Sequence, residues 1–128
     1  MAVVTHGVTL ATTTGASTYP TGSFTPVVDD LLVALVNVTG TAAVGSMSDS
    51  LGGTWTQVAS AVGQVSTAKI WCFVRNSLVS GAAMTVTMDV TGDPGTGCML
   101  FVARVSGMVK VGAAAALQTA TQSQQASG

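Results

Sequence analysis

The chain has 128 residues, which is enough for a single domain with one hydrophobic core. Charged residues make up 7% of it, against roughly 25% in an average protein, and the formal net charge is −1. This composition excludes the basic surface that binds nucleic acid or anionic lipid. With 48% hydrophobic residues, it also excludes a chain that is disordered throughout. Twenty Val, nineteen Thr and no Glu favour strands over helices, so the composition predicts an all-β fold.

No segment is typical of a membrane span or a secretion signal. The longest uninterrupted apolar run, Leu31 to Val36, is far shorter than the roughly 20 residues that cross a bilayer. The first ten residues lack the basic start and the apolar stretch of a secretory signal. We therefore expect neither a membrane partner nor export by that route.

The first third of the chain predicts two strands separated by a loop. Residues 3 to 10 alternate in the period-2 pattern of a half-buried strand. Residues 11 to 26 are mostly small and polar with two prolines, and they predict a long loop or arm. The run LLVALVNV at residues 31 to 38 does not alternate, which indicates a central strand covered on both faces.

The middle of the chain predicts a hairpin and a further strand. Residues 44 to 62 place a glycine pair between two short strand-like pieces, and Trp55 begins the return strand. Residues 68 to 76 alternate between an aliphatic face, expected in the core, and a mixed face. The aliphatic face holds Ile70, Cys72 and Val74, and the mixed face holds Lys69, Trp71, Phe73 and Arg75.

The last third predicts two clear strands and a tail. Residues 83 to 90 place Met84, Val86, Met88 and Val90 inward, and residues 98 to 107 form a mostly buried strand after a turn. Residues 108 to 111 add a short last strand, and residues 112 to 128 are a low-complexity, flexible tail. The result is an antiparallel, jelly-roll-like β-sandwich of seven or eight strands over residues 1 to 111.

The predicted core takes residues from five of these strand segments. It consists of Leu32, Ala34, Val36, Trp55, Ile70, Cys72, Val74, Val86, Met88, Leu100 and Val102.

Four segments resemble a module of tailed-phage virion proteins over roughly residues 28 to 109. They are DLLVA at residues 30 to 34, MSDSLGGTWTQVASA at 47 to 61, KIWCFVRNSLVSGAAMTVTM at 69 to 88 and LFVARVSGM at 100 to 108. Gly53 stands where that module usually has Asn in its D-S-x-G-N-T-W-like hairpin. The resemblance implies a jelly-roll sandwich that acts as a structural subunit or decoration of a phage particle. Related sandwiches also occur as carbohydrate-binding modules.

The sequence offers little chemistry. His6 is the single histidine, and no Ser, Cys or carboxylate around it forms a nucleophile motif. Asp49, Asp89 and Asp93 lie at or near turns, where Asp commonly caps backbone amides. Ca²⁺ binding by Asp89 and Asp93 lacks the D-x-D-x-D spacing. Cys72 and Cys98 lack metal-ligand or redox spacing and are expected to be buried, reduced thiols. We expect no catalytic, cofactor-binding or metal-binding residues, and no cofactor.

Two hypotheses for function remain. The first is a non-enzymatic capsid decoration protein of a virion, assembled in the host cytoplasm. It would form a homo-oligomer, with a trimer as one candidate state, and dock on the major capsid protein or other virion subunits. The second is a carbohydrate-binding or adhesion module with an aromatic platform. The residues expected to interact or stack are Tyr19, Phe24, Trp55 and Trp71, although Trp55 and Trp71 are also natural core plugs.

Overall fold

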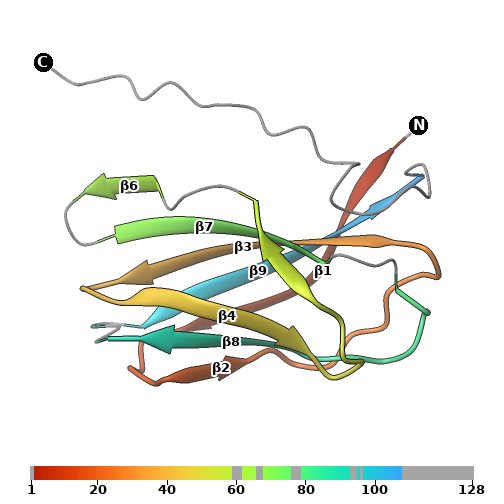
Figure 1. Cartoon of the computed structure of the whole chain (residues 1–128). Helices are drawn as coiled ribbons and strands as arrows, with labels where there is room; N and C mark the ends of the chain where they lie inside the picture. The colour runs from red at the N-terminus through yellow and green to blue at the C-terminus, as the bar shows by residue number, and fades with distance from the viewer. Residues whose placement is uncertain are drawn as a thin grey trace, which may run out of the picture.

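The computed structural model describes residues 2 to 58, 62 to 65, 68 to 75, 79 to 92, 95 and 97 to 107. In this part of the chain the structure consists of strands and connecting loops, in two antiparallel sheets that pack as a sandwich (Figure 1). The predicted all-β sandwich is therefore confirmed. No helix in the described ranges is long and apolar enough to cross a membrane.

The strands of the two sheets are β1 (Val3–Thr12), β2 (Thr18–Pro20), β3 (Leu31–Thr39), β4 (Ala43–Asp49), β5 (Trp55–Gln57), β6 (Val62–Val65), β7 (Ala68–Arg75), β8 (Val86–Thr91) and β9 (Cys98–Ser106). The larger sheet has the order β1-β9-β3-β7-β5, and β6 pairs with the same edge of β7 as β5 does. The smaller sheet has the order β2-β8-β4. Because β5 and β6 share one position, the described strands occupy eight positions, as predicted.

The strand pairing is that of a jelly roll, in which a long hairpin is folded back across two sheets. The first strand pairs with the last (β1 with β9), the second with the next to last (β2 with β8), and β3 with β7. The innermost pair of a regular jelly roll would join β4 to β5. Here β4 lies in the smaller sheet and β5 in the larger one.

This difference corrects the predicted hairpin at residues 44 to 62. The glycine pair does not turn β4 back onto a partner strand. Instead, Gly52 has a positive φ of 73°, and the turn carries the chain from the smaller sheet to the larger one. Trp55 begins the next strand as predicted, but it pairs with Arg75 of β7.

The predicted long loop or arm at residues 11 to 26 is loop for most of its length, but it contains a short strand. Residues 18 to 20 form β2, which pairs with β8, and Phe24 makes a bridge with Met84. Tyr19 is only 3% exposed, so its ring anchors this segment in the core. The small, polar composition gave no sign of this attachment, in which Tyr19, Phe24 and main-chain hydrogen bonds hold the segment to the sandwich.

The core lies between the sheets, and most of the predicted residues are in it. Leu32, Ala34, Val36, Trp55, Val86, Met88, Leu100 and Val102 are all buried there. All four inward residues predicted on the clean amphipathic strand are buried as well, which confirms its phase: Met84, Val86, Met88 and Val90.

The phase of β7 is the opposite of the prediction. Trp71 and Phe73 face the core, whereas Ile70 and Cys72 are half-buried on the other side of the strand. Val74 is buried too, but in a second cluster with Leu31. Trp71 and Phe73 occupy the core because each ring removes more apolar area from water than an aliphatic side chain does. The charge of Arg75 on the same face is neutralised inside the protein, as described below.

The predicted strand at residues 108 to 111 and the tail at residues 112 to 128 lie outside the described residues. The domain boundary between them stays a prediction.

Candidate interaction surface

The motif DSLGGTW builds a buried polar network around Asp49, at the end of β4. Asp49 Oδ1 accepts hydrogen bonds from the backbone N–H groups of Leu51 (2.9 Å) and Gly53 (3.1 Å). Asp49 Oδ2 accepts from Trp55 Nε1 (2.9 Å) and Arg75 Nε (2.8 Å). The carboxylate thus shapes the turn and positions the indole and the guanidinium. As predicted, Asp49 caps backbone amides.

The surroundings of Asp49 lower the pKa of its carboxyl group below the ordinary value of 3.8. Burial is the largest single influence and raises the pKa, because it disfavours the charged form. The hydrogen bonds from Arg75, Gly53 and Trp55, with the charge of Arg75, together outweigh burial. A proton donor for catalysis needs a raised pKa. Asp49 is therefore suited to holding the fold rather than to general acid chemistry.

A second ion pair closes the loop that leads from β2 to β3. Asp30 Oδ2 accepts from Arg104 Nε (2.7 Å) and from the backbone N–H of Val27 (3.0 Å). The Asp30 side chain is nearly inaccessible to water. Arg104 therefore neutralises the buried Asp30 carboxylate, as Arg75 neutralises that of Asp49.

The described residues contain no group of three metal-ligating side chains. Asp89 accepts hydrogen bonds from Thr18 Oγ1 (3.3 Å) and Ser46 Oγ (2.9 Å), which tie β8 to its two neighbours. Asp93, the other residue considered for Ca²⁺, lies outside the described residues.

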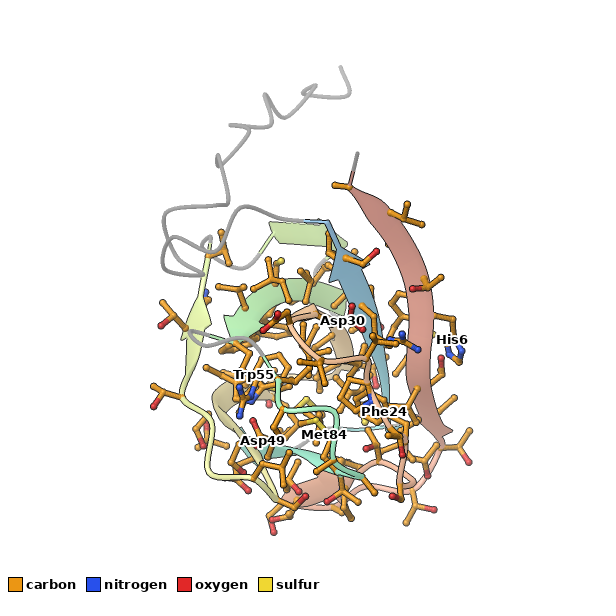
Figure 2. The ribbon with its side chains drawn as sticks, turned by 90° about the vertical axis from the view of Figure 1, so that its right-hand side faces the viewer. His6, Phe24, Asp30, Asp49, Trp55 and Met84 are labelled. Atoms are coloured by element: carbon orange, nitrogen blue, oxygen red, sulfur yellow. The ribbon has the colours of Figure 1, made fainter. Side chains whose placement is uncertain are left out.

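The four aromatic residues expected to interact lie mostly inside the sandwich. Tyr19, Trp55 and Trp71 are buried in the core, and Phe24 is half-buried against it. Figure 2 shows Trp55 pointing into the interior beside Asp49, whereas His6 points outward from β1. A ring stacks on a sugar only through a solvent-exposed face, so Tyr19, Trp55 and Trp71 present no stacking platform in this structure. A contact of Phe24 with a partner stays a prediction.

The surface that stands out is the outer side of the larger sheet, which we call the outer sheet face. Alternation and cross-strand pairing place its members in four strands. They are Val4, His6, Thr9 and Ala11 of β1, Met99, Phe101, Ala103 and Val105 of β9, Leu31, Val33, Leu35 and Asn37 of β3, and Ile70, Cys72 and Val74 of β7.

The centre of the outer sheet face is apolar and accessible, whereas Leu31, Val74 and Ala103 at one end of it are buried. Leu35 lies between Cys72 and Phe101 and is 44% exposed, and Met99 is 49% exposed. His6 lies against the ring of Phe101, with ring centroids 5.5 Å apart. None of the fifteen members is Asp, Glu, Lys or Arg. A central strand of a sandwich usually exposes polar residues on its outer side. The exposed apolar side chains of this face therefore favour contact with another molecule.

The outer side of the smaller sheet has the opposite character. Pairs across β8 join Ser46 to Asp89 and Ser48 to Thr87, and Thr18 of β2 pairs with the same Asp89. Hydroxyl groups and a carboxylate hydrate well, so this side is suited to water. The sandwich is therefore two-sided, with an apolar sheet face on one side and a hydroxyl-rich one on the other.

The sequence carried a signal for the outer sheet face. The run LLVALVNV lacks alternation, which predicted a strand covered on both faces, and residues 98 to 107 were predicted to form a mostly buried strand. Leu35, Met99 and Phe101 were not predicted as interaction residues, because their exposure on one sheet face depends on the order of the strands. We found no match to this chain among models of protein families, curated proteins or solved structures, so its function is argued from these surfaces.

Proposed function

We propose that the protein is a non-enzymatic structural subunit that associates through the outer sheet face. In this proposal it is a capsid decoration protein of a phage virion, assembled in the host cytoplasm, which forms a homo-oligomer and docks on the major capsid protein. The observation that carries the proposal is the uncharged, apolar outer sheet face with Leu35 and Met99 exposed at its centre.

The physical argument is one of desolvation. Covering apolar area contributes roughly 25 cal/mol per Å², whereas burying an unpaired charge costs several kcal/mol. The outer sheet face offers the first contribution without the second cost, because none of its members is Asp, Glu, Lys or Arg. Large permanent interfaces are apolar in the same way.

The two-sidedness of the sandwich supports docking on a larger body. A decoration protein must bind with one side and remain soluble on the other. The hydroxyl groups and Asp89 on the smaller sheet supply a hydrated side opposite the apolar one. The jelly-roll pairing and the resemblance of residues 28 to 109 to phage virion modules support the choice of a virion as the larger body.

No observation favours the carbohydrate-binding alternative. Its expected platform residues Tyr19, Trp55 and Trp71 have buried rings. The absence of an exposed ring at those positions leaves that hypothesis without its binding element.

The test is sedimentation, first of the purified protein and then of the protein with tailed-phage heads, at about 0.1 M and about 1 M salt. We expect association at both salt concentrations, because an apolar contact is not screened. Leu35→Lys/Met99→Lys should abolish sedimentation with the heads. The matched control is Thr41→Lys/Ser48→Lys, which adds the same charge at exposed positions away from the outer sheet face and should behave as the wild type. A wild-type protein that stays monomeric and never sediments with heads would refute the proposal.

A further inference from the structure

The sheet edges of the sandwich are not equally protected against pairing with another chain. Natural edge strands are kept from pairing by shortness, proline, bulges or charge. β2 has three residues and ends on Pro20, and β5 also has three. β4 has a bulge between Val44 and Ser46 and ends on the inward-pointing Asp49. Each of these edges therefore has at least one such feature.

β1 is the edge with the least protection. It has ten residues, VVTHGVTLAT, with no proline and no Asp, Glu, Lys or Arg. It pairs with β9 on one side, and no described strand pairs with its other side. A bulge between His6 and Val8 divides it, but the half from Val8 to Thr12 keeps an unbroken pairing of five residues with β9. That half presents a regular row of backbone donors and acceptors to a partner.

We propose that the residues 8 to 12 half of β1 pairs with the same segment of a second copy, antiparallel, about a two-fold axis at Leu10. The axis places Leu10 opposite Leu10 of the other copy, and Thr9 opposite Ala11. A strand with no formal charge can face itself without like-charge repulsion, and an antiparallel contact between identical segments closes as a dimer. The inference rests on the proposed function, for which it supplies the geometry of self-association.

The pairing also enlarges the surface that docks. An axis perpendicular to the sheet keeps the two outer sheet faces on the same side. Thr9 and Ala11 lie beside Phe101 and Met99, so the apolar centres of both copies flank the junction. The dimer would then present one continuous apolar face from two larger sheets. A face of double area docks more strongly than either copy alone.

The test introduces like charges at the two positions that face each other. Thr9→Lys/Ala11→Lys places lysines opposite lysines, and Thr9→Asp/Ala11→Asp places carboxylates opposite carboxylates. Each variant alone should have a dimer dissociation constant raised by about tenfold or more, measured by analytical ultracentrifugation. An equal mixture should form a heterodimer that weakens as salt rises. Thr41→Lys/Ser48→Lys is the control for added charge and should dimerise like the wild type.

Disulfide cross-linking between cysteine variants tests the register of the pairing. A mixture of Thr9→Cys and Ala11→Cys proteins should form a disulfide-linked dimer on mild oxidation, because directly opposed Cβ atoms are about 5 Å apart. Either variant alone should not, because its cysteines lie on a diagonal of about 7 Å or more. The wild type, with Cys72 and Cys98 alone, is the control.

The outcomes separate this inference from the proposed function. Dimers that persist in both charged variants, or an absence of the mixed disulfide, overturn the pairing of β1. If such dimers or their binding to heads are still lost in Leu35→Lys/Met99→Lys, the proposed function stands without it. A wild-type protein that neither associates nor binds heads overturns both.

Discussion

Arg75 of β7 donates a hydrogen bond from Nε to Oδ2 of Asp49, at 2.8 Å, and so joins the larger sheet to the smaller one. The Asp49 side chain is fully buried, and that of Arg75 is 6% exposed. The same carboxylate accepts the indole N–H of Trp55 and two amides of the turn that links the sheets. A single side chain therefore holds the crossing between the sheets where the regular jelly-roll pair is missing.

Asp49→Ala should destabilise the protein by about 3 to 5 kcal/mol, because it leaves the Arg75 guanidinium buried without its carboxylate partner. This is a large part of a typical stability of about 5 to 15 kcal/mol. The measurement is the free energy of unfolding in urea. Asp89→Ala removes a carboxylate whose two hydrogen bonds are exposed, and it should cost about 1 kcal/mol or less. Equal losses in the two variants would contradict the role of Asp49.

Asp49 should also make stability depend on acid. Its pKa in the folded protein is lower than the ordinary value of 3.8, so the folded state favours the charged carboxylate. The stabilisation is present above the unfolded value and is lost as the pH falls through the lower, folded value. Urea unfolding of the wild type and of Asp49→Asn should therefore differ most near neutral pH. The difference should shrink below pH 3.8. A difference that grows on acidification would show the opposite shift.

Gly53 should not tolerate a side chain. A Cβ atom at this position would overlap Arg75 Nε and Asp49 Oδ2, both of which belong to the buried ion pair. Gly53→Ala and Gly53→Asn should therefore lower the melting temperature by several degrees or more. Gly22→Ala is the control, because nothing lies within 4 Å of its added Cβ. An Asn variant as stable as the wild type would show that the turn accommodates a side chain at position 53, as the turn of the phage module does, where Asn is usual.

The strands could be predicted because their patterns report local geometry. The alternation of Met84, Val86 and Met88 predicted the burial that the structure shows. The unbroken run from Leu31 to Val38 predicted a strand covered on both faces, but only its core face is fully buried, because Leu35 on the outer side is 44% exposed. The same local rule failed at β7, since both of its faces can be buried and the pattern cannot rank them. Trp71 and Phe73 occupy the core because Asp49, which is distant in sequence, neutralises Arg75 on the same face of the strand.

The surfaces were harder to predict than the strands. Whether an outer face is covered depends on sheet order, which brings Leu35 beside Phe101 and Cys72 from distant parts of the chain. The candidate aromatic residues were plausible only if exposed, and exposure is a tertiary property. The glycine pair likewise signalled a turn but not the sheet to which the returning strand would belong.

Val86→Asp should abolish folding. Val86 of β8 is completely buried between the sheets, and an unpaired carboxylate there costs several kcal/mol. Thr87→Asp is the matched control, because its side chain points to the hydroxyl-rich outer side, opposite Ser48 and Pro20. It should melt within a few degrees of the wild type. Circular dichroism melting distinguishes the two, and a folded Val86→Asp protein would show the inward phase of β8 to be wrong.

The two thiols should be reduced and should differ in reactivity. Neither Cys72 nor Cys98 is in a disulfide, and burial raises the pKa of both thiols, so the reactive thiolate is scarce at neutral pH. Titration of the denatured, unreduced protein with a disulfide reagent should count two thiols; a count of zero would refute the claim.

In the native protein both thiols should react more slowly than glutathione. Cys98 lies in the core, whereas Cys72 lies beside Leu35 on the outer sheet face, so Cys72 should react first. Its reaction should slow further when phage heads are added, because docking covers that face. A rate for Cys72 that is unchanged by bound heads would place the contact elsewhere on the sandwich.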